Sequence, residues 1–195
     1  MNFLKILPLS QSRLDVLLEI YSEKEDYLRN ISQKLKMHPS LTFNILHKLH
    51  HSKFIMRRNA GKEVQYSLEK NRDYELLVKI LEEYHLEKIT HRSKNVNTAI
   101  TLIINNPELM NASSKIYLYG SYVVGNYTNE SDIDILFVND DRKMVGKICR
   151  EISIVVGKEL NPLIYTLAKF RSELENKEPL LTSIVNNIKN RAIIK

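Results

Sequence analysis

The apolar residues in the first fifty positions of the chain recur at helical spacing in three separate runs. The runs cover 10–22, 27–37 and 41–50, and within each the apolar side chains return every three or four residues. Such spacing predicts three amphipathic helices. Ser10 begins the first run and Ser40 precedes the third, where a hydroxyl group can cap free backbone N–H groups.

The period changes after this third run. Two short apolar runs, 54–56 and 64–66, flank a polar stretch at 59–62 that contains Gly61, which predicts a β-hairpin with its glycine in the turn. Residues 70–88 then carry an apolar stripe among charged positions, which predicts a further helix. This helix either connects two domains or pairs two subunits in a homodimer, and the sequence leaves both uses open.

The second half of the chain alternates between helical and extended patterns. Residues 90–97 are the least patterned segment and mark the expected domain boundary. The later patterns predict helices over 97–106, 142–157, 167–175 and 179–189, and strands over 116–119, 132–138 and 160–166. This alternation indicates an α/β or α+β arrangement with a small sheet.

Composition is that of a globular protein. The 195 residues include 43% hydrophobic and 27% charged residues, and no apolar run approaches the ~18 residues of a membrane span. The first fifteen residues lack the cleavage site of a signal peptide and are expected to belong to the structure. Cys149 is the single cysteine, so no internal disulfide is possible, and a reducing, cytoplasmic location is expected.

Charge is distributed unevenly along the N-terminal part. Between Tyr27 and Tyr66, eight lysine or arginine residues stand against one acidic residue, Glu63, whereas the preceding stretch is acidic. The net charge of the whole chain is +6. A basic block inside a folded pattern indicates a face that binds nucleic acid.

Three short helices followed by a basic hairpin resemble the winged helix-turn-helix domains of archaeal and bacterial transcription regulators, over residues 10–69. The resemblance implies that double-stranded DNA is a partner and that the helix at 41–50 is the recognition helix. The residues expected to contact DNA are Thr42, Asn44, His47 and Lys48 on that helix and Arg57, Arg58 and Lys62 on the wing. The alternative is that the same module binds only protein.

Two aspartates stand at alternate positions in a strongly apolar run. Residues i and i+2 of a strand point to the same face, roughly 6–7 Å apart, so the carboxylates of Asp132 and Asp134 are expected side by side. Mg²⁺, a hard cation with oxygen ligands, offsets the repulsion between such groups. Upstream, Gly120 and Ser121 end the preceding predicted strand, where a glycine permits close approach of a phosphate and a serine adds a hydroxyl donor.

These two motifs together resemble the nucleotidyltransferase superfamily of DNA polymerase beta in its minimal form. The family joins Gly-Ser to Asp-x-Asp on the next strand, which here reads GSYVVGNYTNESDID, and Gly125 also matches. The resemblance covers residues 95–190 and implies a nucleoside triphosphate, ATP in the first place, with Mg²⁺ or Mn²⁺. The site residues that it implies are the catalytic, metal-binding Asp132 and Asp134 and the nucleotide-binding Gly120, Ser121 and Ser131.

The two resemblances predict an α+β chain, in which a winged helix-turn-helix precedes a small mixed-sheet, nucleotidyltransferase-like α/β domain. The winged helix DNA-binding domain is expected at 1–69. A connecting helix and linker follow at 70–94, and the nucleotidyltransferase-like domain occupies 95–195.

Two departures from the family pattern bear on activity. Active members often place a basic residue between the serine and the second glycine, whereas positions 122–124 here read Tyr-Val-Val. Active members also bring a third carboxylate from a later strand, and the matching residue is Asn161, which cannot take a proton from an attacking hydroxyl group. Glu159 has the same strand parity and is the first substitute to consider, ahead of Glu151 on the preceding helix.

Two functions from different classes follow. In the first, the protein is a DNA-binding transcriptional regulator whose nucleotidyltransferase-like domain binds a Mg²⁺–nucleotide, with weak or no transfer. In the second, it is an active nucleotidyltransferase, an adenylyltransferase related to toxin–antitoxin pairs for example, that transfers a nucleotide to a protein, RNA or small molecule. Asn161 and the missing basic residue favour the first. The histidines at 47, 50 and 51 are expected to face DNA or solvent, not metal.

Overall fold

A computed structural model describes residues 9–195. The first eight residues, which the sequence analysis included in the winged helix domain, lie outside the described residues. The chain divides into two compact units between Tyr84 and His85, and each unit is described by itself. The predicted domain limits at 69 and 94 stay predictions.

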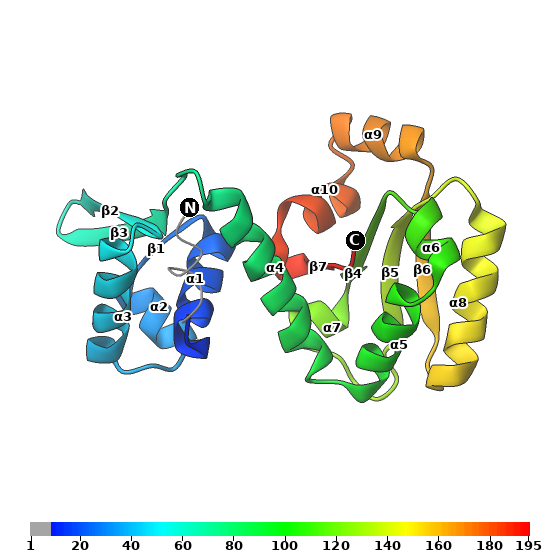
Figure 1. The fold of residues 1–195 in the computed structure, drawn as a ribbon, viewed down its shortest axis with the longest axis horizontal. Helices are drawn as coiled ribbons and strands as arrows, with labels where there is room; N and C mark the ends of the chain where they lie inside the picture. Colours follow the sequence, from blue (N-terminus) through cyan, green and yellow to red (C-terminus); the bar gives the residue numbers. More distant parts are fainter. Residues whose placement is uncertain (1–8) are drawn as a thin grey trace. The chain divides into compact units, whose positions relative to one another are not determined.

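The N-terminal unit is a winged helix. Its helices and strands are α1 (Gln11–Glu23), β1 (Glu25–Tyr27), α2 (Leu28–Lys34), α3 (Pro39–His51), β2 (Ile55–Ala60) and β3 (Glu63–Leu68) (Figure 1). The three strands form an antiparallel sheet in the order β1-β3-β2. Three helices and a two-stranded wing, in this order, confirm the predicted fold of this unit.

Two local details differ from the prediction. Helix α3 begins at Pro39 and is capped by His38, whose Nδ1 accepts the backbone N–H of Ser40. Proline favours the first helical position because its φ angle is preset and it has no N–H group to satisfy, which moves the cap ahead of the serine. Ser10 does precede α1, but its side chain makes no capping hydrogen bond.

The core of this unit lies between the three helices and the sheet. Its buried members include Val16, Leu17, Ile20, Ile31, Ile45, Leu46, Leu49, Phe54, Ile55, Tyr66 and Leu68. Seven of these residues lie on the three predicted helices, which therefore supply much of the core, although Leu41 at the start of the third predicted helix is exposed.

Helix α4 (Tyr74–Thr90) contributes side chains to both units. Leu77 and Leu81 are buried in the core of the N-terminal unit, and Ile89 is buried in the core of the C-terminal unit. Near the end of the N-terminal unit, Tyr84 donates a hydrogen bond to Asp15 at 3.0 Å. The apolar side chains of α4 are therefore buried within the protein itself. A homodimer through this helix stays a prediction, and it would have to use other side chains of the helix.

The C-terminal unit has three layers, a mixed sheet between two layers of helices. Its elements are α5 (Lys94–Ile104), α6 (Pro107–Ala112), β4 (Lys115–Tyr119), α7 (Ser121–Val124), β5 (Ile133–Val138), α8 (Arg142–Val156), β6 (Leu160–Tyr165), α9 (Leu167–Glu175), α10 (Pro179–Asn186), the 3₁₀ helix η2 (Ile188–Asn190) and β7 (Arg191–Ile193). The strand order is β6-β5-β4-β7, with β5 and β6 parallel and the other pairs antiparallel. This confirms the predicted small mixed sheet.

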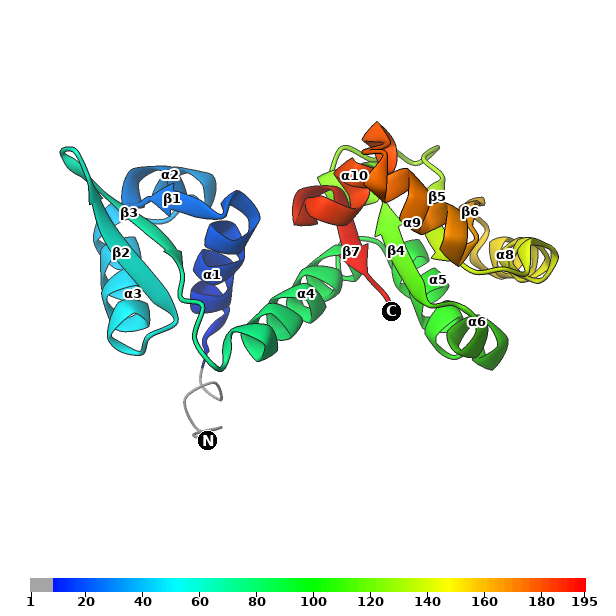
Figure 2. The same cartoon turned by 90° about the horizontal axis from the view of Figure 1, so that it is seen from above.

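Helices cover the two faces of this sheet differently. Alternate residues of β5, among them Ile133, Ile135 and Phe137, pack against α5 and α8. The other face carries Leu136 and Val138 and packs against α9 and α10, as Figure 2 shows for the arrangement of the helices. Asp134 shares the parity of Leu136, so it belongs to the face on which α9 and α10 lie.

The pattern of the sequence did not predict several short elements, among them β1, α6 and β7. The two strands have three residues each and α6 has six. Segments of this length span fewer than two periods of burial, so only tertiary pairing or a capping residue identifies them. Within residues 9–195, none of the helices is long and apolar enough to cross a membrane.

Candidate functional site

The Gly-Ser motif and Asp134 meet at one end of neighbouring strands. Antiparallel pairing sets Tyr119, the last residue of β4, opposite Asp134 on β5. Gly120 follows with a φ of 78° and a ψ of −155°, a conformation almost restricted to glycine. A Cβ atom at this position would lie 2.2 Å from Oδ2 of Asp134. The glycine therefore lets the carboxylate lie directly against the backbone of the predicted phosphate cradle.

Asp134 is half-buried and hydrogen-bonded to Asn161. Parallel pairing of β5 with β6 sets the two residues side by side, and Nδ2 of Asn161 donates to Oδ1 of Asp134 at 3.1 Å. Burial raises the pKa of Asp134, the Asn161 hydrogen bond opposes the rise, and the charge of Asp132 adds to it. The structure thus brings together both aspartates and the residue at the expected third-carboxylate position.

Tyr119 lies next to this group and was not singled out in the sequence. Burial raises the pKa of its phenol to about 12, with further contributions from the charges of Asp134 and Tyr165. The phenol therefore keeps its proton at neutral pH and is suited to donate a hydrogen bond, not to act as a base. Only the register of β4 against β5 reveals this neighbour, and periodicity does not supply that register.

The loop between α7 and β5 is held by side-chain hydrogen bonds around Ser131. Its hydroxyl group accepts the backbone N–H of Thr128 at 2.9 Å. Its carbonyl oxygen accepts from the Tyr122 hydroxyl at 3.3 Å and from Lys158 Nζ at 3.1 Å. Ser131 and Lys158 thus position the segment that leads into Asp132, and contact between Ser131 and a nucleotide stays a prediction.

The three positions considered for further charged groups, 124, 151 and 159, differ in their placement. On α7, Val124 is the exposed residue, at 58% of its full accessibility, so an apolar side chain stands where active relatives often have a cation. Glu151 lies on α8, which packs on the opposite face of the sheet, and its carboxylate is 3.8 Å from Lys147. Glu159 is exposed and precedes β6 with the parity of Asn161, so it is the substitute that remains to be tested.

The aspartate pair fits one magnesium ion bound together with phosphate. Mg²⁺ in phosphoryl-transfer sites is held by one or two carboxylates, and phosphate oxygens and waters complete the shell. The influences on the pKa of Asp134 are burial, Asn161 and Asp132, and none of them is a cation. A divalent ion would supply the positive charge that this carboxylate pair lacks.

Replacing Gly120 with alanine is expected to destabilise the C-terminal unit by roughly 1–3 kcal/mol, the usual cost of a residue held in an unfavourable backbone region. The added methyl group also displaces the Asp134 carboxylate. Gly157→Ala is the matched control, because Gly157 also has a positive φ of 68° but a Cβ there meets nothing within 4 Å. Urea unfolding of both variants checks this, and an equal loss in both contradicts the close contact.

Asp134→Asn is expected to stabilise the metal-free protein at neutral pH. In the folded state the pKa of Asp134 is raised from its ordinary value of 3.8. Between the pKa of the unfolded state and that of the folded state, the folded protein binds more protons than the unfolded one, so stability falls as the pH rises. The asparagine removes this loss and keeps an oxygen that can accept the Asn161 hydrogen bond. The gain should not exceed about 1 kcal/mol because the group is partly hydrated.

Urea unfolding with a chelator at pH 7 and at pH 4 measures this effect. The advantage of the variant should shrink at the lower pH, where the wild-type carboxyl group becomes protonated. A wild type that is as stable as the variant at pH 7 contradicts the assignment of Asp134 as an uncompensated carboxylate.

The predicted recognition helix exposes a mixed polar and apolar face. Asn44, His47 and Lys48 are exposed, as their predicted role requires. Leu41 and Phe43 are also exposed, at 49% and 52%, and the sequence analysis did not include them. A face of this kind offers both hydrogen-bonding groups and apolar surface to a partner.

The prediction that Thr42 contacts DNA is wrong. Its side chain is fully buried, and its hydroxyl group donates to the carbonyl oxygen of His38 at 3.3 Å. Thr42 comes three residues before Ile45 and four before Leu46, so helical spacing turns it toward the core. A polar side chain with a local backbone acceptor is accommodated there, which explains why polarity alone misplaced it.

The basic residues of the wing are exposed. Arg57, Arg58 and Lys62 extend from β2 and its turn. Arg58 donates a hydrogen bond to Oε1 of Gln65 on the facing strand at 2.7 Å. This contact holds one guanidinium group along the hairpin, where it is accessible to a phosphate.

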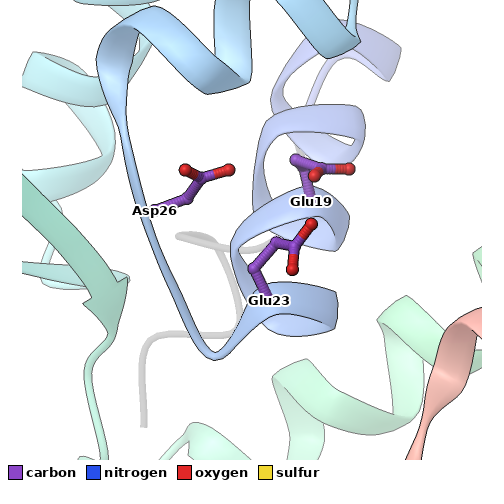
Figure 3. A group of neighbouring side chains, drawn as sticks. All are labelled: Glu19, Glu23 and Asp26. Carbon is purple, nitrogen blue, oxygen red and sulfur yellow. The ribbon is translucent and has the colours of Figure 1, made fainter.

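One basic residue of the N-terminal block is not available to such a face. Lys34 Nζ lies 2.9 Å from Glu19 and 3.0 Å from Asp26, and it also pairs with Glu23. Figure 3 shows these three carboxylates converging from α1 and β1. Their hydrogen bonds raise the pKa of Lys34 against the effect of burial. The ammonium group thus offsets part of the negative charge of these carboxylates and links α2 to α1 and β1.

Comparison with known proteins supports the assignment of the C-terminal unit. Residues 106–195 match the family model described as "Nucleotidyltransferase domain". A Methanocaldococcus jannaschii protein named "Putative protein adenylyltransferase MJ0604" is 39% identical over 61 residues, which are 31% of this chain and 61% of that protein. The chain therefore spans about three fifths of the curated relative that it matches.

Solved structures similar to this chain include three bacterial proteins. A variant of ZitR from Lactococcus lactis is 20% identical, and the match covers 47% of this chain and 62% of the ZitR chain with a TM-score of 0.40. Reduced HlyU from Vibrio cholerae is 18% identical, with 42% and 86% covered and a TM-score of 0.38. The transcriptional regulator Tm0710 from Thermotoga maritima is 19% identical, with 46% and 66% covered and a TM-score of 0.36.

These TM-scores lie below 0.5, so the winged helix assignment rests on the element order and the sheet of the N-terminal unit. The chain thus joins a unit with the winged helix fold to a unit whose residues 106–195 match the nucleotidyltransferase family model.

Proposed function

We propose that the protein is a DNA-binding transcriptional regulator whose nucleotidyltransferase domain binds a Mg²⁺–nucleotide, expected to be ATP, and transfers the nucleotide weakly or not at all. The observation that carries this proposal is the hydrogen bond from Asn161 to Asp134. Asn161 is the residue at which the resemblance expects a carboxylate, and its amide accepts no proton. General-base catalysis is typically worth about 10²–10⁴ in rate.

The nucleotide site supports binding better than turnover. Gly120 and Ser121 would lie against the phosphates, and Asp132 and Asp134 would hold Mg²⁺, which neutralises phosphate charge when it is bound. A fixed cation that stabilises charge in the transition state is worth a few kcal/mol, and α7 presents Val124 in its place. The site therefore favours ground-state binding through one metal over efficient transfer.

The DNA-binding half of the proposal rests on the exposed residues of α3 and the wing. Asn44, His47 and Lys48 form a polar strip on the predicted recognition helix, and Arg57 and Arg58 extend from β2. In winged helix domains a helix of this kind reads base edges while basic residues contact phosphates. Lys34, which pairs with the carboxylates of Glu19, Glu23 and Asp26, lies on α2 and is not part of this strip.

The addition of Mg²⁺ and ATP together is expected to raise the unfolding temperature of the C-terminal unit by several degrees. A ligand that is selective for the folded state stabilises it by about 2.7 kcal/mol at a hundred times its dissociation constant. The double variant Asp132→Asn with Asp134→Asn should abolish the rise. Asp140→Asn, at an exposed aspartate beyond the end of β5, is the control and should keep it.

Thermal unfolding with ATP alone, Mg²⁺ alone and both together measures this effect. A wild type that shows no shift at millimolar Mg²⁺–ATP contradicts nucleotide binding at this site.

Active protein adenylylation is the second candidate function. It is favoured by the intact Asp132 and Asp134 pair and by the name of the Methanocaldococcus jannaschii relative. In that case Glu159 would have to take the role expected of the third carboxylate. Transfer of label from ATP to an acceptor separates the two functions.

A further inference from the structure

His47 and His51 lie one turn apart on the exposed side of α3, and their Nε2 atoms are 3.1 Å apart. The two rings meet edge to face, with centroids 4.3 Å apart and an interplanar angle of 62°. Residues i and i+4 of a helix are surface neighbours. The helix therefore presents two imidazole nitrogens at one point beside it.

This separation is that of two ligands on one metal ion. Zn²⁺ binds imidazole nitrogen at about 2.0–2.1 Å, so two ligands of a tetrahedral ion are roughly 3.3 Å apart and two ligands at a right angle are roughly 2.9 Å apart. The observed 3.1 Å lies between these values. A pair of histidines at i and i+4 on one helix is an established way to bind zinc.

The structure also provides room for an ion beside the pair. Both histidines line a cavity of about 260 Å³ together with Arg13, Lys48 and Phe54. This volume accommodates an ion and the waters that complete its coordination shell. The pair thus lines an open hollow in the N-terminal unit.

The chemistry of this hollow selects the kind of ion. Within residues 9–195, none of the residues that line it is acidic, and Arg13 and Lys48 are basic. Hard ions such as Mg²⁺ and Ca²⁺ are bound mainly by carboxylate oxygens, and this lining contains no carboxylate. Imidazole ligands bind Zn²⁺, Ni²⁺ and Cu²⁺ through short coordinate bonds instead.

We propose that His47 and His51 form a binding site for a divalent transition-metal ion, with water in the remaining coordination positions. The expectation from the sequence was that these histidines face only DNA or solvent. The site goes beyond the proposed function and does not depend on it. One consequence does depend on it: because His47 also belongs to the face assigned to DNA, bound metal and bound DNA exclude each other.

Calorimetric titration of Zn²⁺ into the full chain, without a histidine tag, tests the site. The titration is made in the Asp132→Asn, Asp134→Asn background, so that zinc on those carboxylates does not contribute. His47→Gln and His51→Gln should each weaken Zn²⁺ binding by at least about 10²-fold, the usual gain of a second linked contact. Glutamine is a good helix former and preserves α3.

His50→Gln is the matched control. His50 lies on the same helix with its ring centroid 6.1 Å from that of His51, and its loss should leave Zn²⁺ binding unchanged. Histidine ring ¹⁵N spectra provide a second readout, in which Zn²⁺ should shift the Nε2 signals of the pair alone. A titration without saturable Zn²⁺ binding, or binding that survives both glutamine variants, overturns the site and leaves an ordinary hydrogen bond between the rings.

Titration of duplex DNA with and without Zn²⁺ tests the consequence. Zn²⁺ should weaken DNA binding, and by linkage DNA should weaken Zn²⁺ binding by the same factor. DNA affinity that does not respond to bound Zn²⁺ overturns the mutual exclusion. Zn²⁺ binding to the pair in a protein that binds no DNA supports the metal site and contradicts the proposed function, so the two failures are distinguishable.

Discussion

Replacing Asn161 with aspartate is expected to raise nucleotidyl transfer by about 10²-fold or more over the wild-type protein. The register of β5 and β6 sets residue 161 beside Asp134, and its side chain already reaches Oδ1 of that residue. A carboxylate there would supply a proton acceptor within reach of the site, and general-base help contributes typically about 10²–10⁴ in rate. Transfer of label from ATP in the presence of Mg²⁺ and cell extract measures the effect.

Asn161→Ala is the control for this variant. It removes the amide hydrogen bond to Asp134 without adding a base, so its transfer should stay at the wild-type level. Equal activity of the alanine and aspartate variants contradicts the role assigned to this position. An aspartate variant that binds Mg²⁺–ATP but transfers no faster than wild type contradicts it as well.

Replacing Arg57 and Arg58 together with alanine is expected to weaken the binding of every duplex sequence and to flatten its salt dependence. Both residues lie exposed on the wing. Each phosphate contact contributes about 0.9 to the slope of log K against log salt concentration, so the slope should fall by about 1.8 if both make such contacts. Fluorescence anisotropy over a series of salt concentrations measures affinity and slope together.

The double variant Lys79→Ala with Lys143→Ala is the control. It removes the same net charge from exposed positions on α4 and α8, outside α3 and the wing, and should change the slope little. Asn44→Ala should instead lower the preference for one sequence over others, since an asparagine side chain reads base edges. Equal effects of the two double variants would show that net charge alone, not the wing, controls binding.

Long periodic segments could be predicted from the sequence, and short ones could not. The strand at 116–119 and the helix at 142–157 appear as β4 and α8 with bounds shifted by one residue. Strand β7 was missed because three residues, Arg191–Ile193, form a strand only through pairing with β4. Local pattern predicts an element when the element is long enough to repeat its period of burial.

The part of the candidate site that depends on alternation along a single strand could be predicted from the sequence. Alternation along one strand puts Asp132 and Asp134 on the same face, and alignment with the family pattern proposes Asn161. The hydrogen bond from Asn161 and the neighbouring phenol of Tyr119 depend on the register between strands. The burial of Thr42 likewise depends on which side of α3 packs against the core, and the polarity of the side chain does not predict this.

The central claim, that the nucleotidyltransferase domain binds nucleotide without efficient transfer, is tested most directly by incubating the wild-type protein with α-labelled ATP and Mg²⁺, alone and with cell extract. The account predicts that little or no label becomes covalently attached to any acceptor, under conditions in which Asn161→Asp gives clear labelling. Robust labelling by the wild-type protein that is lost in Glu159→Gln would contradict it, because Glu159 would then be the third carboxylate of an active enzyme.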